Sequence, residues 1–426
     1  MGRLRASGRG FRVSFGALGA AVAALLVASI GVLADDDPNA DVPDNPGVGL
    51  ATSTTNFGGA APLGSSNTVR HWSGQTPNGA DGVTYRYNIV GADPATGGSA
   101  VVGVDIIPLD LTVNGMAFNG SGIAGGVLAS PLFSAGNYTS TMRASTATGG
   151  RGAGGWLSAG NTGVQYVDAA MRAQFDAVGT TYHLVLDPTV LEPTAIDVSS
   201  DNGTTMTNPL TGVTYAFVDQ HWFSTRIQNQ LGRRHLDPTR LALFVTYNVL
   251  LYDGTPANCC SMGGHGAGTA ASPTSNGSAH GNGNQQVQTF AWGSWLSAGF
   301  LSSRTQWFDQ DVYPISHELM EWANNPFADN TVQPWTSAAA PQYGCSNEFE
   351  TADPVANLGF TLGVNTTWDA NPFARDRQFH LSEEALLPWF MRSAPATQAS
   401  QSGGSRFTLM GDLNHVGIFH QPAPGC

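Results

Sequence analysis

The sequence of 426 residues contains no lysine, so all 18 of its basic residues are arginines. This absence excludes any chemistry that needs a lysine nucleophile or a lysine Schiff base. The basic residues are outnumbered by 31 acidic ones, and the formal net charge is −13. A chain this acidic lacks the basic face that follows a phosphate backbone, so we expect no nucleic-acid partner.

Cysteine is also scarce, with four residues and no C-x-x-C motif. A thioredoxin-like site and a cysteine-rich zinc ribbon are therefore disfavoured. The even number fits two disulfides in an exported protein. The adjacent residues Cys259 and Cys260 are poor candidates for bonding to each other, so we expect them to reach Cys345 and Cys426. The chain also lacks a G-x-S-x-G motif, which argues against a typical α/β-hydrolase.

Only one long apolar run is present, and it lies at the N-terminus. Residues 15–34 carry no charge, follow a leader with four arginines and precede an acidic triplet at 35–37. This order is typical of a cleaved secretory signal peptide, here residues 1–34. The run is just long enough to be an uncleaved anchor, but its glycine and alanine content favours cleavage. We therefore expect a secreted or extracytoplasmic protein with no stable membrane anchor after cleavage.

The rest of the chain, with 53 glycines in total, predicts a folded, loop-rich protein of the α+β class. Residues 35–68 are predicted to be a flexible linker. A β-rich N-terminal region follows at 69–200, and a second region with strands and helices at 201–426. The main predicted strands are 83–90, 100–107, 181–186, 241–252 and 286–296, and the predicted helices are 164–176, 218–231, 309–325 and 381–392. A glycine-rich loop at 253–284 is predicted to act as a lid.

The most informative segment is the predicted helix at 309–325. His317 and Glu321 are four residues apart in it, so they share one face with Cβ atoms ~5–6 Å apart. An imidazole and a carboxylate at this spacing can hold one divalent cation. Glu318 follows the first of them and can reach a water molecule at that cation. The pattern follows the logic of H-E-x-x-H, with Glu321 in place of the second histidine.

A catalytic cation needs a third ligand and an open position. The best candidates are Glu350 and Asp353, in a turn downstream of the helix. Three other residues are reserves: His265, His380 and Glu348. A third histidine would favour zinc, whereas one histidine with two carboxylates makes a harder site that suits manganese, iron or calcium.

A competing interpretation makes His317 and the two glutamates a solvated helix face. The apolar neighbours Ile315 and Trp322 argue against it, because buried acids normally have a partner or a function. Another acidic pair, Glu383 and Glu384, is explained without catalysis. These two residues fall in the first turn of the predicted helix at 381–392, where acidic side chains favour the helix dipole.

The motifs at 316–321, 325–326 and 350–354 resemble those of a group of exported bacterial proteins. These proteins carry S-H-E-x-x-E, a following (D/N)-P and then E-x-G-D-P, and further likeness lies at 165–172 and 379–381. They are identified as zincin-like metallopeptidases, so the resemblance implies a zincin-like α+β catalytic domain at 201–426 around a metal-binding helix. It further implies His317, Glu321 and Glu350 as metal ligands and Glu318 as general base. Ala352 stands where the group often has glycine.

A fainter resemblance is to the plant EXORDIUM, or phosphate-induced, extracellular proteins. It lies at 260–266, which contains His265, and at 325–327. That family lacks the His-Glu pair and is not established as enzymatic. The resemblance implies that His265 is a structural residue near the site or a metal ligand, and we favour a loop residue with satisfied hydrogen bonds.

Two functional hypotheses follow from the sequence. In the first, the protein is a secreted metal-dependent hydrolase, a metallopeptidase that acts on peptide or protein substrates with a divalent metal, preferably zinc. In the second, it is a non-catalytic extracellular binding or cell-wall-associated protein on a zincin-like or EXORDIUM-like scaffold. Substituting Glu318 with glutamine discriminates between them, since only the first hypothesis needs its carboxylate.

Overall fold

The computed structural model describes eleven segments of the chain, all within one unit that spans residues 31–426. They are residues 68–76, 81–138, 145–146, 162–270, 286–298, 310–337, 344–356, 358–363, 378–393, 396–397 and 405–409. The predicted signal peptide and all but the last residue of the predicted linker lie outside them. Strands outweigh helices in the described residues, so the broad α+β prediction is confirmed.

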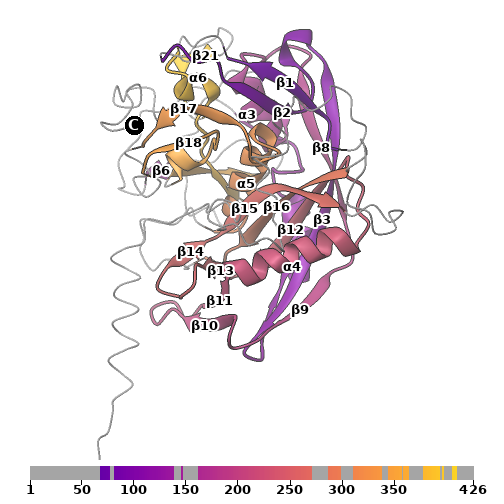
Figure 1. Ribbon diagram of the computed structural model, residues 1–426, viewed down its shortest axis with the longest axis vertical. Coiled ribbons are helices and arrows are strands. Elements are labelled where there is room, and N and C mark those ends of the chain that lie inside the picture. Colours follow the sequence, from indigo (N-terminus) through magenta and orange to yellow (C-terminus); the bar gives the residue numbers. More distant parts are fainter. Residues whose placement is uncertain are drawn as a thin grey trace, which may run out of the picture. The chain divides into compact units, whose positions relative to one another are not determined.

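A seven-stranded sheet forms the centre of the fold (Figure 1). Its longest strand, β3, pairs in parallel with β8 and β9 on one side and with β12 on the other. Strand β16 adds in parallel to β12, and β15 pairs antiparallel with β16 at the edge. The seven strands are β3 (Ser99–Val113), β4 (Met116–Asn119), β8 (His183–Val190), β9 (Thr194–Val198), β12 (Leu241–Tyr247), β15 (Gly263–Ala270) and β16 (Gln286–Trp295).

Both faces of this sheet are covered by helices. Alternate residues of β12 point to opposite sides: Leu241 and Leu243 join one hydrophobic cluster, whereas Ala242 and Phe244 join the other. The first cluster includes residues of α3 (Tyr166–Gln174) and α5 (Tyr313–Asn324), and the second includes residues of α4 (Gln220–Arg233). A strand buried on both faces reads as a continuous apolar run, which explains the sequence of β12.

The remaining elements form smaller sheets and short helices. A four-stranded sheet joins β10 (Gly203–Thr207), β11 (Thr214–Asp219), β13 (Val249–Tyr252) and β14 (Cys259–Ser261). The other strands are β1 (His71–Gln75), β2 (Arg86–Val90), β5 (Gly136–Asn137), β6 (Ser145–Thr146), β7 (Thr162–Val164), β17 (Thr331–Trp335), β18 (Ser346–Glu348), β19 (Leu358–Gly363), β20 (Gln378–Ser382), β21 (Ala396–Thr397) and β22 (Ser405–Arg406). Among the described residues, the other helices are α2 (Ala124–Ala129), α6 (Leu387–Phe390) and three short 3₁₀ segments, Pro94–Thr96, Gly120–Gly122 and Asp353–Val355.

Most predicted elements exist, with shifted boundaries. Helix α4 begins later than predicted because the Asp219 carboxylate accepts a hydrogen bond from the Trp222 N–H at 2.9 Å and caps it. The predicted strand at 241–252 is two strands in different sheets. They divide at Asn248, whose φ of 52° is left-handed, a conformation that asparagine tolerates.

The predicted helix at 381–392 is wrong for most of its length. Strand β20 occupies its start, and α6 is a single turn. Backbone groups here bond to distant segments instead of to their own helix: the N–H of Ala385 donates to Thr351 and that of Leu386 donates to Phe407. Glu383 and Glu384 are consequently fully buried and do not lie in a helix turn.

The predicted loop at 253–284 contains two strands, β14 and β15. Two of its described glycines allow other segments to pack closely against the backbone. A Cβ atom on Gly263 would lie 2.1 Å from the Glu318 Oε1, and one on Gly268 would lie 2.8 Å from the Gln228 Oε1. His265 lies in strand β15, so the prediction that it is a loop residue was wrong. Residues 271–284, on which the lid prediction also depends, lie outside the described residues.

The cysteines leave the predicted pairing untested. The sulfur atoms of Cys259 and Cys260 lie together, but this adjacent pair does not establish a disulfide. Cys426 lies outside the described residues. The pairing of Cys259 and Cys260 with Cys345 and Cys426 stays a prediction.

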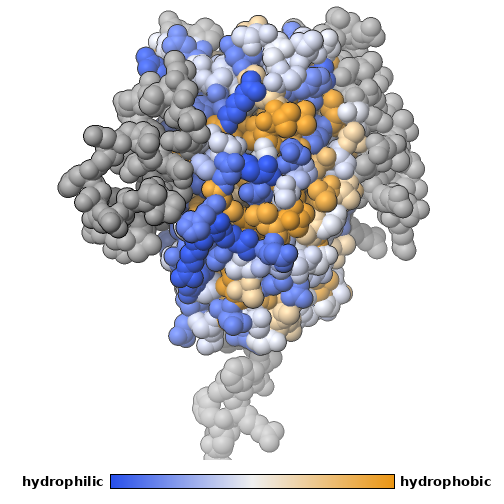
Figure 2. Space-filling model, turned by 90° about the vertical axis from the view of Figure 1, so that its right-hand side faces the viewer, coloured by the Kyte–Doolittle hydropathy of each residue, from blue (hydrophilic) through white to orange (hydrophobic). Residues whose placement is uncertain are grey.

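The surface mixes polar and apolar groups. Figure 2 shows hydrophilic and apolar side chains interspersed over one face of the molecule. Exposed valines include Val101 and Val185, which are register partners on β3 and β8. Among the described helices, none has both the length and the apolar character required to cross a bilayer.

Candidate metal centre

Helix α5 carries the predicted motif and is buried on all sides. It starts at Tyr313 with a proline in its first turn and ends before Asn325, close to the predicted limits. All twelve of its residues are buried, including His317, Glu318 and Glu321. The helix packs against β15, β16, β20 and α3. A helix that is apolar all round would explain such a position, but this helix places three ionisable groups inside the protein.

Three of the predicted donors meet on one side of α5. The His317 Nε2 lies 3.2 Å from the Glu321 Oε2 and 3.4 Å from the Asp353 Oδ1. Donor atoms of these three residues all lie within 4.8 Å of one another, and all three residues are buried. We call His317, Glu321 and Asp353 the first donor group.

The backbone fixes Glu321 in this position. Its Oε1 accepts hydrogen bonds from the N–H groups of Ala352 at 3.0 Å and Asp353 at 3.1 Å. These bonds fasten the 352–353 turn to the helix and direct the Oε2 towards His317.

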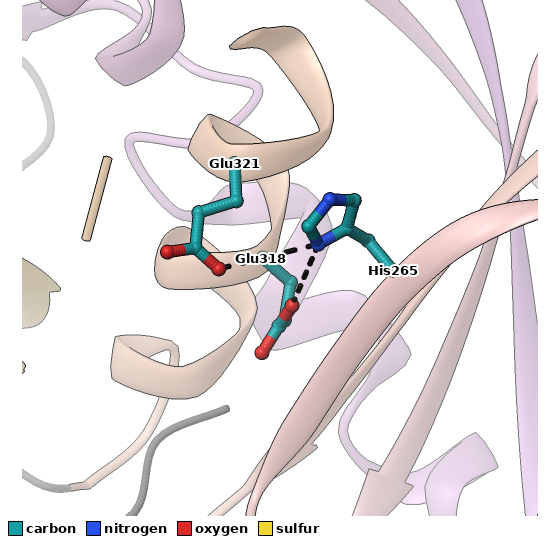
Figure 3. A group of neighbouring side chains, drawn as sticks. All are labelled: His265, Glu318 and Glu321. Carbon is teal, nitrogen blue, oxygen red and sulfur yellow. Dashed lines mark ion pairs between the residues drawn. The ribbon is translucent and has the colours of Figure 1, made fainter. Parts of the chain in front are cut away.

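A second donor group lies on the side of α5 that faces β15. The His265 Nδ1 lies 3.5 Å from the Glu318 Oε2 and 4.0 Å from the Glu321 Oε2 (Figure 3). Donor atoms of His265, Glu318 and Glu321 again all lie within 4.8 Å of one another. Glu321 therefore belongs to both groups. The absence of a side chain at Gly263 allows β15, which carries His265, to approach Glu318 closely.

Glu350 contacts the other ring nitrogen of His265, the Nε2. Its Oε2 is 3.5 Å from the His265 Nε2, and its Oε1 accepts a hydrogen bond from the Asn325 Nδ2 at 2.8 Å. The Asn325 Oδ1 in turn accepts from the backbone N–H groups of Asp329 and Asn330. The resemblance implied Glu350 as the partner of His317 and Glu321, whereas the structure brings Asp353 to that position.

The chemistry of the donors fits a divalent cation. Tetrahedral zinc with bonds of ~2.0–2.2 Å keeps its donor atoms about 3.3–3.6 Å apart, close to the 3.2 and 3.4 Å separations around His317. Within the described part of the chain, neither ring nitrogen of His317 makes a hydrogen bond. Burial, helped by the nearby His317, lowers the pKa of His265 to about 3. This imidazole is therefore neutral, as a metal ligand must be.

The other reserve residues lie elsewhere. The His380 Nδ1 contacts the Asp311 Oδ2 at 2.6 Å, and its Nε2 faces Gln310 at 3.2 Å. Asp311 also accepts from the backbone N–H of His380 at 2.8 Å. Glu348 is exposed on β18. The structure thus unites five predicted residues with His317 and leaves His380 and Glu348 outside the cluster.

Sequence reasoning missed one buried acid beside this cluster. The Tyr166 hydroxyl donates to the Glu384 carboxylate, and burial is the main cause that raises the pKa of Glu384 to about 8. Charges on His317 and Asp353 also act on this carboxyl group. Its segment is tied to α5 by the Ser382 N–H, which donates to the Ser316 Oγ at 2.9 Å. Two adjacent acids within an apolar stretch were the available signal.

In comparisons with known proteins, no family model, no curated protein and no solved structure matches the chain.

Proposed function

We propose that the protein is a secreted metal-dependent hydrolase, a zincin-like metallopeptidase whose cation is held by the first donor group. The observation that carries the proposal is the buried meeting of His317, Glu321 and Asp353, with donor atoms all within 4.8 Å. One histidine and two carboxylates accept zinc and also harder cations such as manganese. Zinc is our preferred metal because of the resemblance of the S-H-E-x-x-E motif.

A cation at this position supplies a Lewis acid that polarises a scissile carbonyl and acidifies a water molecule. The chain's own residues do the rest. Glu318 adjoins His317 in the sequence, and its carboxylate accepts the proton of the attacking water and passes it to the leaving nitrogen. His265 lies beside this carboxylate, with its Nδ1 3.5 Å from the Glu318 Oε2. Glu321, fixed by two backbone N–H groups, keeps the cation at the helix.

The test is a separation of metal binding from hydrolysis. In Glu318→Gln the donors of the first group are unchanged, so the purified variant should retain one equivalent of zinc by mass spectrometry. Its hydrolysis of a fluorescent casein substrate should fall by a factor of about 10²–10⁴, the usual contribution of a general base. Glu348→Gln removes an exposed carboxylate on β18 and is the matched control, with full activity expected.

One observation favours a non-catalytic alternative. His317, Glu318 and Glu321 are 0% exposed, and a buried ion can serve stability alone. On a binding or wall-associated protein, Glu318→Gln would leave every functional readout unchanged, and metal removal would lower only the unfolding temperature. Wild-type protein that binds zinc but hydrolyses no peptide bond in a mixed peptide library would establish this alternative.

A further inference from the structure

The second donor group has no role as a cation site in the mechanism above. We propose that His265, Glu318 and Glu321 form a second, inhibitory cation position that takes Glu318 out of proton transfer when it is filled. This inference rests on the proposed hydrolase function for its consequence, but the second binding position stands on its own geometry. It makes the centre a pair of neighbouring positions that share one carboxylate.

The geometry of the second group resembles that of the first. Each group has one buried imidazole and two buried carboxylates, and in each the donor atoms lie within 4.8 Å of one another. The Glu321 Oε2 is the common donor, 3.2 Å from the His317 Nε2 and 4.0 Å from the His265 Nδ1. Figure 3 shows His265 reaching from its strand towards both glutamates of the helix. A carboxylate placed between two imidazoles can serve two cations.

Charge favours more than one cation. The cluster brings together four carboxylates, those of Glu318, Glu321, Glu350 and Asp353, and two imidazoles. When all four carboxylates are ionised, one divalent cation balances only half of their negative charge. A second divalent cation completes the balance. Four carboxylates and two histidines are also the donor set of the di-iron and di-manganese carboxylate centres of helix bundles.

The contact distances predict the order of filling. Donor separations around His317 are 3.2 and 3.4 Å, while those around His265 are 3.5 and 4.0 Å. The first group is nearer the spacing that a tetrahedral cation needs, so it should bind more tightly. In the second group Glu318 is itself one of the donors. A carboxylate whose oxygen is bonded to a metal no longer accepts the proton of water, so occupancy of this position stops hydrolysis.

The experiment is a zinc titration of the purified, metal-free full chain. Equilibrium dialysis with mass spectrometry should give two zinc equivalents per wild-type chain at saturation. Casein hydrolysis should rise to a maximum at one equivalent and then fall by about 100-fold as the second binds, since a general base is worth ~10²–10⁴. His265→Ala should bind one equivalent and lack the falling phase. His380→Ala, which removes a histidine paired with Asp311 instead, should behave as wild type.

The outcomes separate this inference from the proposed function. If the wild type saturates at one zinc ion per chain, the second position does not exist. This result needs no variant, so it holds even if His265→Ala fails to fold. Two equivalents in folded His265→Ala also overturn it. Full hydrolysis at two equivalents overturns the inhibitory role. If the wild type binds two zinc ions and His265→Ala binds one, but neither hydrolyses peptides at any zinc level, then the second position stands and the hydrolase proposal fails.

Discussion

Helices α4 and α5 cover opposite faces of the same sheet, but they bury different kinds of side chain against it. In α4 the buried residues form an apolar stripe, with Phe223, Ile227 and Leu231 inside and His221 and Arg226 exposed. In α5 every residue is buried, charged ones included. Helix α4 has a side-chain cap at its N-terminus, whereas α5 has none.

The difference contrasts a helix that buries an apolar stripe with one that buries a cluster of ionisable side chains. An amphipathic helix needs only a sheet to cover. A helix that buries His317, Glu318 and Glu321 must recover the cost of removing them from water, which is several kcal/mol for an ion without compensation. Part of this cost is recovered by the two backbone N–H groups that donate to the Glu321 carboxylate and by the contacts of the glutamates with histidines. The cation proposed for the first donor group would supply the rest.

The largest expected effect is a loss of stability without a loss of metal binding, after a substitution in the core of α4. Phe223 is 2% exposed and packs against Trp292 with ring centroids 5.0 Å apart. Phe223→Ala should lower the free energy of unfolding by about 3–5 kcal/mol, because it removes a buried ring and leaves a cavity. Zinc affinity should not change, since α4 contributes no donor to either group. Urea unfolding and zinc titration of the same sample measure both quantities.

The counterpart on α5 is Glu321→Ala. Saturating zinc at about a thousandfold excess over Kd stabilises a binding protein by ~4 kcal/mol, and this gain should vanish in the variant. If Phe223→Ala weakens zinc binding tenfold, or if zinc still stabilises Glu321→Ala, then the assignment of stability to α4 and of zinc binding to α5 is wrong.

The sequence predicted the α5 motif well because its signal is local. Spacing alone placed His317 and Glu321 on one face, and both now lie 3.2 Å apart at the donor atoms. The position of His265 was not predictable in the same way. A glycine-rich stretch resembles a loop, whereas contacts with residues distant in sequence, such as that of Gly263 with Glu318, explain glycines within strand β15. Likewise, Glu384 looked like a surface acid because the backbone partners of its segment are distant in sequence.

The next prediction uses Glu384, the buried acid that contacts α3 rather than the donor groups. Its carboxyl group ionises with an ordinary pKa of 4.5 in the unfolded chain, whereas folding raises this pKa to about 8, chiefly through burial. Between these values the folded state holds the proton and the unfolded state does not. Stability of the metal-free protein should therefore fall as the pH rises from 4.5 through 8.

Glu384→Gln keeps a polar partner for Tyr166 and removes the titration, so its unfolding free energy should change less over this range. Urea unfolding in a chelator at about pH 5.5 and about pH 8 gives the two slopes. Glu348→Gln, which alters an exposed acid, should keep the wild-type slope. Equal slopes in Glu384→Gln and wild type would show that another group governs this dependence.

The smallest effect concerns the caps. Asp219→Ala removes the carboxylate that accepts the Trp222 N–H at the start of α4 and should cost about 1 kcal/mol. Asp219→Asn retains an acceptor there and should recover most of that loss, which distinguishes the cap from a general effect of charge. Helix α5 has no such group to remove, because Pro314 occupies its first turn and packing holds it in place. Urea unfolding of both variants measures the difference, and a loss in Asp219→Asn equal to that in Asp219→Ala would contradict the capping role. Because α4 relies on a local cap and α5 on its surroundings, a change at Asp219 should leave zinc binding untouched.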